Sequence, residues 1–183
     1  MNEKEKMLCG KLYNSTDSEL VSARARAKLL CFEYNSLSPD KQNEKTKLIK
    51  SLFYKTGENF IIEPNLFVDY GYNIEIGENF YSNHNLVILD CAKVTIGNNV
   101  LIGPNCGFYT AEHPLEVNLR NKGLEYARPI SIGNNVWLGG GVTVLSDVTI
   151  GDNVVIGAGS VVTKNIPENS IAVGNPCKVI KKL

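Results

Sequence analysis

The sequence lacks a net charge and any long run of apolar residues. Its 19 basic and 19 acidic side chains cancel, so no overall field draws the chain to nucleic acid or to an anionic membrane. The start is charged from Glu3 to Lys6 and no apolar stretch follows, which argues against a secretory signal and a membrane-spanning helix. We therefore expect a cytoplasmic protein with neither nucleic acid nor membrane as a partner.

Histidine is scarce and the cysteines form no motif. There are two histidines, and the five cysteines are scattered, odd in number and without metal-ligand spacing. Neither a disulfide framework nor a zinc site is indicated, so we expect reduced thiols and no metal requirement. Glycine is plentiful at 16 residues, and asparagine often follows it. Both residues suit tight corners with positive φ.

A six-residue repeat fills most of the chain from about Ile62 to the C-terminus. From Ile130 the first and third places of the hexads are apolar almost throughout, and the fourth is Gly in four of six. The same frame holds upstream from Val94, and an earlier run fits with Ile62 and Val68 in first places. Ala92-Lys93 then reads as a two-residue insertion between the two runs.

The hexads predict a mainly β fold, a parallel β-helix. Successive strand residues point to opposite faces, so places one and three point the same way, and Gly-x-x turns the corner. Three hexads close a coil of about 18 residues, coils stack at roughly 4.8 Å, and the repeats supply about five coils, more than the roughly three needed for a shared core. A β-sandwich is the alternative, but its strands are longer and its turns less regular.

The two departures from the repeat are the N-terminal third and residues 110–128. We divide the chain into a helical segment, 1–58, and the β-helix, 59–183. Thr16 to Glu19 reads as a capping box before a helix through Tyr34, and Ser38-Pro39 as the start of a second helix through Phe53. Such helices would cover the unpaired strand edges of the first coil.

Residues 110–128 are polar and without hexads, which predicts a projecting loop. Long loops in compact domains are often functional. This loop contains His113, whereas His84 lies among corner residues of a hexad. A histidine side chain suits proton transfer near neutral pH, so His113 is a candidate base, although a lone loop histidine is also common surface decoration.

These features together resemble a known enzyme family. The hexads, the loop motif ending in His113-Pro114 and the segment from Gly174 to Ile180 are similar to those of the hexapeptide-repeat acetyltransferases. The segment from Met7 to Tyr13, with Tyr34-Asn35, resembles the maltose and galactoside O-acetyltransferase branch. The resemblance covers essentially the whole chain. It implies a left-handed coil, a homotrimer with active sites between subunits, and acetyl transfer from acetyl-CoA to a sugar hydroxyl.

The resemblance also implies roles for individual residues. His113 would be the general base that takes the hydroxyl proton, and the oxygen would attack the thioester directly. Asn83 would donate its amide N–H to the oxyanion and contact the sugar. The remaining sugar contacts would be Ser15, Asp69, Asp90 and Glu125.

Three positions depart from the galactoside type and favour glucose or maltose as the acceptor. Ser15 stands where the galactoside type has an acid. Cys91 replaces one of two adjacent acids and leaves only Asp90. Glu125 stands where the galactoside type has an apolar residue and is closer to the maltose type.

Acetyl-CoA would lie along the late hexads. Small residues there would let its pantetheine arm approach the coil, an outward tryptophan would line the site, and lysines would meet its phosphates. The implied residues are Trp137, Gly139, Gly140, Ala158, Thr163, Lys164, Lys178 and Lys181. The C-terminal lysines could instead form a solvated basic tail, and Trp137 could pack at a subunit interface.

Other functions remain open at this point. The same family could act on another acceptor, such as an antibiotic, an amino acid or an oligosaccharide. Zinc carbonic anhydrases share this kind of β-helix but need three histidine ligands, and only two histidines are present. A non-enzymatic structural solenoid, such as an ice-binding surface, would need a regular outward threonine array, which Thr95, Thr143 and Thr149 do not form.

Overall fold

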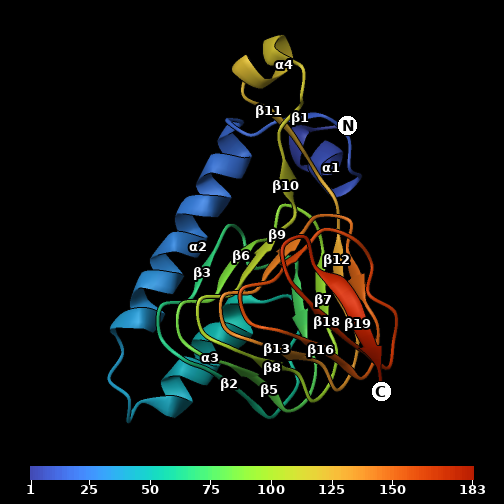
Figure 1. Ribbon diagram of the computed structural model, residues 1–183. Coiled ribbons are helices and arrows are strands. Elements are labelled where there is room, and N and C mark those ends of the chain that lie inside the picture. The colour runs from blue at the N-terminus through green and yellow to red at the C-terminus, as the bar shows by residue number, and fades with distance from the viewer.

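Short strands wind into three sheets that form the faces of a solenoid (Figure 1). The computed structural model describes residues 1–183. The four-stranded sheet contains β4 (Ile74–Ile76), β7 (Val94–Ile96), β12 (Ile130–Ile132) and β15 (Thr149–Ile150). The five-stranded sheet contains β3 (Phe67–Val68), β6 (Val87–Leu89), β9 (Gly107–Tyr109), β14 (Thr143–Leu145) and β17 (Val161–Val162).

The third face is a seven-stranded sheet. Its parallel strands are β2 (Phe60–Ile62), β5 (Phe80–Ser82), β8 (Leu101–Ile102), β13 (Trp137–Leu138), β16 (Val154–Ile156) and β18 (Ser170–Val173). The last strand, β19 (Lys178–Lys182), folds back antiparallel on β18. The predicted parallel β-helix is confirmed, and it has about six turns rather than about five because partial coils at both ends add strands to this sheet.

Early coils are two residues longer than late ones. Asn65 and Asn85 occupy one corner of successive early coils and are 20 residues apart, whereas the late pair Asn134 and Asp152 is 18 apart. The predicted insertion at Ala92-Lys93 therefore has a counterpart one coil earlier. In consequence the frame assigned to Ile62 and Val68 was wrong: they pair with Ser82 and Ile88, and so occupy third places.

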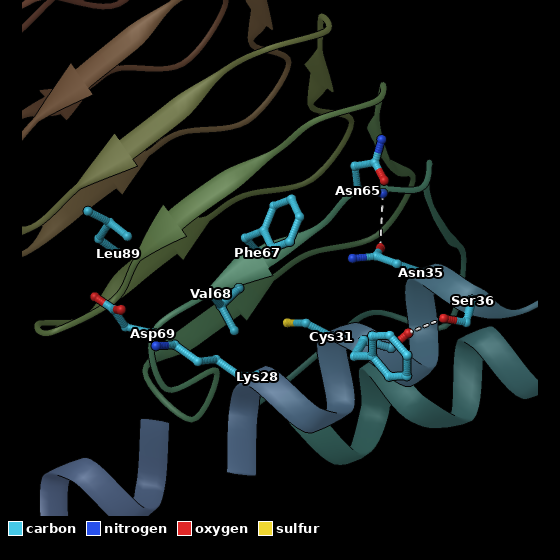
Figure 2. A pocket seen from close by; sticks show the side chains of 10 residues that line it. Lys28, Cys31, Asn35, Ser36, Asn65, Phe67, Val68, Asp69 and Leu89 are labelled. Atoms are coloured by element: carbon cyan, nitrogen blue, oxygen red, sulfur yellow. Dashed lines mark hydrogen bonds between the residues drawn. The ribbon is translucent and has the colours of Figure 1, made fainter. Parts of the chain in front are cut away.

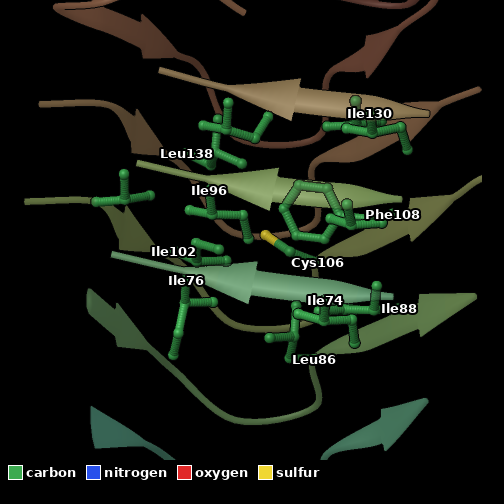
Figure 3. Close-up of a cluster of buried hydrophobic side chains, with 14 of the residues drawn as sticks. Ile74, Ile76, Leu86, Ile88, Ile96, Ile102, Cys106, Phe108, Ile130 and Leu138 are labelled. Carbon is green, nitrogen blue, oxygen red and sulfur yellow. The ribbon is translucent and has the colours of Figure 1, made fainter. Parts of the chain in front are cut away.

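The first and third places of the hexads fill one continuous core. Figure 3 shows Ile76 below Ile96 on neighbouring coils of one sheet, with Ile130 on the next coil of that sheet and Phe108 beside them. These four side chains belong to a cluster of 34 buried residues that also takes in apolar residues of the N-terminal helices. The helical segment and the solenoid thus share a core.

Asparagine, more than glycine, turns the corners. Asn65, Asn85 and Asn105 have φ of 69, 64 and 60°, a left-handed conformation that asparagine tolerates. The side-chain amides of Asn65 and Asn85 each donate to the Oδ1 atom of the next asparagine in the stack, at 2.9 and 2.8 Å. A second ladder runs through Asn79, Asn99 and Asn135. The side-chain hydrogen bonds therefore tie successive coils together at two corners.

Helices close the solenoid at the first coil. The N-terminal elements are α1 (Glu3–Leu8), β1 (Tyr13–Asn14), α2 (Ser18–Ser36) and α3 (Gln42–Leu52). Figure 1 shows α2 and α3 against the end that carries β2 and β3. The Tyr34 hydroxyl donates to the carbonyl of Ile62, and Asn35 Oδ1 accepts from the backbone N–H groups of Asn65 and Leu66. The predicted covering of the first strand edges is confirmed. None of the helices is long and apolar enough to cross a bilayer.

Both predicted helix starts were wrong in detail. The N-cap of α2 is Asp17, not Thr16, and its side chain accepts from the N–H of Glu19. Ser38 lies in a turn, where its hydroxyl donates to Asp40, and α3 begins four residues later at Gln42 without a side-chain cap.

The predicted loop projects from the solenoid and has structure of its own. It contains β10 (Ala111–Glu112), α4 (Val117–Asn121) and β11 (Leu124–Ala127). β11 pairs antiparallel with β10 and with β1, giving a three-stranded sheet in the order β1-β11-β10. In Figure 1 this sheet stands beside α1, and α4 lies farthest from the coils. The N-terminal segment thus packs directly on the loop that carries His113.

Candidate active site

A cavity of about 230 Å³ lies where the loop meets the corner between the five-stranded and four-stranded sheets. Four residues predicted for the site line it together, namely Ser15, Asp69, His113 and Glu125. Its other lining residues are Arg24, Leu89, Cys91 and Ala111. The N-terminal segment, two coils and the loop therefore each supply part of one wall.

His113 and Glu125 face each other across the loop strands. The distance from His113 Nε2 to Glu125 Oε1 is 4.0 Å. The His113 side chain is 59% exposed and that of Glu125 is 19% exposed. The second oxygen, Oε2, accepts a hydrogen bond of 2.8 Å from the hydroxyl of Tyr13. The imidazole of His113 is thus open to a reactant, while the carboxylate of Glu125 is held in place by Tyr13.

Asp69 and Cys91 form a second polar pair on neighbouring coils. The thiol of Cys91 donates to Asp69 Oδ2 over 3.5 Å. Burial raises the pKa of Asp69, and it also raises the pKa of the Cys91 thiol well above its ordinary value. Cys91 is therefore a neutral donor at physiological pH, and this corner carries one carboxylate at the cavity.

Asp90 does not line the cavity, contrary to the prediction that it contacts the sugar. It is fully buried, and its carboxylate accepts from the backbone N–H groups of Tyr70 at 2.8 Å and Asn73 at 3.3 Å. Burial raises its pKa to about 7. Its function in this structure is to hold the two-residue insertion of the preceding coil.

Arg24 on α2 connects the cap to the solenoid. Its guanidinium donates to the hydroxyl of Tyr70 and to the carbonyl of Ser15, both at 2.6 Å. The Ser15 hydroxyl in turn donates to the carbonyl of Gly123 in the loop, at 3.1 Å. Tyr13 and Arg24 were not among the predicted site residues, because nothing in their local sequence distinguishes them from surface or core positions of the cap.

Asn83 lies at a different corner from His113. It follows β5, where the chain passes from the seven-stranded to the five-stranded sheet, and its Oδ1 accepts from the N–H of His84 at 2.8 Å. Gly140 and Ala158 follow β13 and β16 at the same corner, and Trp137 is 55% exposed on β13 beside it. Within one chain, the corner that carries Asn83 does not reach the cavity lined by His113.

Thr163 lines a second cavity, of about 470 Å³, on the other side of the loop base. Glu112 and Ser146 line it too and are hydrogen-bonded to each other. Ala111 borders both cavities, so the two lie on either side of β10. Lys164 follows Thr163 at this corner. The residues predicted for acetyl-CoA thus divide between two edges of the solenoid.

Gly139 has a structural reason to be small. A Cβ atom at this position would lie 2.6 Å from the backbone nitrogen of Ala158 in the next coil, so stacking alone requires glycine. A Cβ at Gly140 would only come within 3.3 Å of Pro104.

Lys178 and Lys181 are exposed on β19, where they face Val173 and Ile171 across the hairpin.

A wider trough adjoins the His113 cavity. It measures about 620 Å³ and lies between α2 and the five-stranded sheet. Figure 2 shows Phe67 and Leu89 along the sheet side, with Lys28 reaching toward Asp69 from the helix. Asp69 and Leu89 border both spaces, so the cavity continues into a mainly apolar surface.

Three protein-family profiles match parts of the chain. The maltose acetyltransferase hexapeptide capping motif matches residues 6–57. The bacterial transferase hexapeptide profile, with six repeats, matches residues 129–164, and the hexapeptide repeat of succinyl-transferase matches residues 93–110.

Relatives match over the full length. A candidate acetyltransferase of Saccharomyces cerevisiae is 54% identical over 98% of this chain and 92% of its own length. One of Dictyostelium discoideum is 49% identical over 100% and 95%. The chain belongs to the hexapeptide-repeat acetyltransferases. This acetyltransferase carries the maltose acetyltransferase type of N-terminal cap.

Solved structures agree with this assignment. A maltose O-acetyltransferase from Clostridium difficile 630 is 51% identical, with a TM-score of 0.99 over 100% of this acetyltransferase and 98% of that chain. A galactoside acetyltransferase in complex with coenzyme A is 47% identical, with a TM-score of 0.96 over 100% and 91%. A hexapeptide-repeat acetyltransferase from Vibrio cholerae, complexed with acetyl coenzyme A, is 35% identical, with a TM-score of 0.91 over 100% and 99%.

Proposed function

We propose that this acetyltransferase moves the acetyl group of acetyl-CoA to a hydroxyl of a sugar such as glucose or maltose. One observation carries the proposal: an exposed imidazole, that of His113, shares a small cavity with the carboxylates of Asp69 and Glu125. A base beside hydrogen-bond acceptors for hydroxyl groups is the arrangement that sugar acylation needs.

The reaction needs one proton acceptor and one oxyanion donor. His113 takes the proton of the acceptor hydroxyl as its oxygen attacks the thioester carbonyl carbon. The tetrahedral intermediate collapses, the C–S bond breaks, and the CoA sulfur receives the proton from His113. The products are a sugar acetate and free CoA. The amide of Asn83 donates to the carbonyl oxygen while it carries negative charge.

His113 and Asn83 lie on different edges of one chain, so we propose that a complete site forms between neighbouring subunits of a homotrimer. The outward face of the seven-stranded sheet supports this arrangement. Ile61, Leu101 and Trp137 are 48, 50 and 55% exposed there, and Leu101 and Trp137 pair directly. An apolar stripe of this kind is typical of a surface that a second subunit covers.

Acetyl-CoA would lie in the same crevice. Gly140 and Ala158 of one subunit leave room for the pantetheine arm, and Thr163 of the neighbour lines its second wall. Lys164, Lys178 and Lys181 are available to the phosphates. The bound CoA and acetyl-CoA of two relatives support this part of the proposal.

The acceptor would occupy the 230 Å³ cavity and, when it is a disaccharide, extend into the trough beside Phe67. Apolar ring faces of a second sugar unit can pack on an aromatic side chain, while Asp69, at the junction, accepts from its hydroxyls.

The test is acetyl-CoA consumption with glucose, maltose, galactosides, amines and antibiotics as acceptors. We expect turnover with glucose or maltose, and we expect His113→Ala to abolish it while acetyl-CoA binding and subunit assembly stay intact. Glu116→Ala is the matched control, because Glu116 lies in the same loop and its side chain makes no cap hydrogen bond. Turnover near the wild-type rate in His113→Ala would refute the mechanism.

A further inference from the structure

We propose that Tyr13 is a positioning residue for acetyl transfer: its hydroxyl fixes the Glu125 carboxylate so that one oxygen stays beside His113. The proposal rests on the function proposed above, in which His113 is the base. It gives the N-terminal cap a part in the chemistry in addition to its part in closing the solenoid.

The contacts form a chain of three side chains. Tyr13 is 1% exposed, and its hydroxyl donates to Glu125 Oε2 at 2.8 Å. The other oxygen, Oε1, lies 4.0 Å from Nε2 of His113. Burial raises the pKa of Tyr13 well above its ordinary value, so the hydroxyl keeps its proton and acts as a donor.

The backbone fixes this geometry. β1 pairs antiparallel with β11, and Tyr13 stands directly opposite Glu125. Directly opposed residues of an antiparallel pair have neighbouring side chains on one face. The Tyr13 ring also belongs to a buried cluster of its own, with Met7, Leu20, Tyr70, Cys91, Ala92 and Ala127. The ring therefore has one place to lie, and its hydroxyl points in one direction.

The segment that carries Tyr13 is tied down on both sides. Ahead of it, Glu3 Oε2 accepts from the N–H of Asn14 at 2.5 Å. Behind it, Ser15 is bonded to the loop through Gly123 and to α2 through Arg24. Movement of the cap relative to the loop would require breaking several of these bonds together.

A held carboxylate beside the base has a chemical consequence. When His113 takes the proton of the acceptor, its ring becomes positive, and a fixed negative charge nearby stabilises that state without reorganisation. A carboxylate free to rotate into water would be less effective. Tyr13 touches neither reactant in this scheme and acts through Glu125 alone.

The first experiment uses hydroxyl deletions in the full-length enzyme. Tyr13→Phe should lower kcat for the sugar by about tenfold, the usual effect of losing one hydrogen bond to a charged group, with the KM for acetyl-CoA unchanged and the melting temperature lowered about as much as in the control. Tyr34→Phe is the matched control, because Tyr34 is an equally buried tyrosine of the cap whose hydroxyl bonds to Ile62. It should lower the melting temperature and leave kcat unchanged.

The second experiment asks whether Tyr13 acts through Glu125. In a Glu125→Ala background, Tyr13→Phe should cause no further loss of kcat, because residues of one network are not additive. An equal loss in both backgrounds, or an unchanged kcat in the single variant, would overturn the proposal.

A spectroscopic readout keeps this proposal separate from the proposed function. The chain has two histidines, so ring ¹⁵N signals are assigned with one His84→Asn variant. Tyr13→Phe should move the signals of His113 and leave those of His84, and Tyr34→Phe should move neither. If the wild-type enzyme acetylates no sugar but the His113 signals move, the proposed function fails and the positioning contact stands. Unmoved His113 signals refute the contact itself.

Discussion

Asp90 is a carboxylate that the solenoid buries in order to hold a corner. Its two oxygens accept from the backbone N–H groups of Tyr70 and Asn73, and its own carbonyl accepts from the Asn73 side chain at 2.6 Å. The bonds that its two carboxylate oxygens accept favour the charged form, but burial, the larger effect, disfavours it, and the pKa rises from its ordinary value of 3.8 to about 7.

This pKa predicts a pH-dependent stability. Because the folded state binds the Asp90 proton more tightly than the unfolded state, the stabilisation from this group is fully present below about pH 3.8 and is lost as pH rises through about 7. Asp90→Asn should therefore flatten the decline in unfolding free energy between these values, measured by urea denaturation at several pH values. A slope identical to wild type would show that Asp90 titrates at its ordinary value.

Glu125 gives a prediction about the acceptor. Because it lines the cavity with His113 and β10 separates that cavity from the one lined by Thr163, Glu125→Ala should raise the KM for the sugar by about tenfold and change the KM for acetyl-CoA much less. Steady-state kinetics with each substrate varied in turn measure both constants. An unchanged sugar KM would remove Glu125 from the acceptor site.

At the scale of residues, the sequence was a better guide to which residues form the site than to where each side chain points. Ser15, Asp69, His113 and Glu125 do line one cavity, because their types and the resemblance pointed to it. Asp90 and Cys91 are adjacent in the sequence, and a carboxylate is the stronger acceptor for sugar hydroxyls. In the structure Cys91 lines the cavity and Asp90 does not, because the side chain of Asp90 points into the corner of the 20-residue coil.

At the scale of elements, the asparagine ladders join successive coils at their corners, where the strands have ended. Asn99 has φ of 56°, accepts from Asn79 at 2.9 Å and donates to Asn135 at 3.1 Å. Asn99 therefore stabilises the corner both through its backbone conformation and through its hydrogen bonds. Two substitutions separate the two contributions.

Asn99→Gly keeps the left-handed backbone accessible but removes the ladder bonds, and should cost about 1 kcal/mol. Asn99→Ala loses the same bonds and also the polar side chain that lets asparagine tolerate positive φ, a further cost of about 1–2 kcal/mol. Urea denaturation of both variants measures the difference. Equal stability of the two would mean that the backbone at this corner relaxes, and a stable alanine variant would show that the ladder bonds contribute nothing.

At the scale of elements, the existence of both long helices and of the hexad strands followed from periodicity, but boundaries did not. Thr16 and Asp17 are both good caps, and only the path of the chain after β1 decides between them. The frame at Ile62 and Val68 was misplaced because an insertion inside a corner leaves the alternation of apolar residues intact on either side. In the loop, β11 pairs with its neighbour β10 and also with β1, far away in sequence, and no local pattern reveals the second pairing.

The whole molecule divides its candidate site residues, such as His113 and Asn83, between two edges of one scaffold. If the site forms between subunits, two inactive variants should complement each other. His113→Ala and Asn83→Ala subunits, unfolded together in equal amounts and refolded, should recover about a quarter of the wild-type activity, because one random subunit contact in four joins two intact halves. Separately refolded samples mixed without exchange are the control. No recovery after confirmed mixing would place the complete site within one chain.

At this scale the sequence was sufficient for the solenoid and its helical cap, since the repeat is nearly continuous and one core serves both. The sequence was not sufficient to show that the candidate site residues lie at two different corners. The corner of a residue such as Asn83 or Asp69 depends on the exact length of each coil before it. A count that is off by two residues moves a side chain from one corner toward the next.

The antiparallel strand β19 has a consequence for the protein in crowded solution. A stack of parallel strands could in principle continue from one molecule into another and grow as a fibril. Here the first edge is covered by α2 and α3, and the last edge of the seven-stranded sheet is a reversed strand with Lys178, Lys181 and Lys182 exposed. Charged, reversed edges resist further strand addition. Lys178 and Lys181, which are candidates for CoA phosphates, therefore also disfavour the addition of a further strand at this edge.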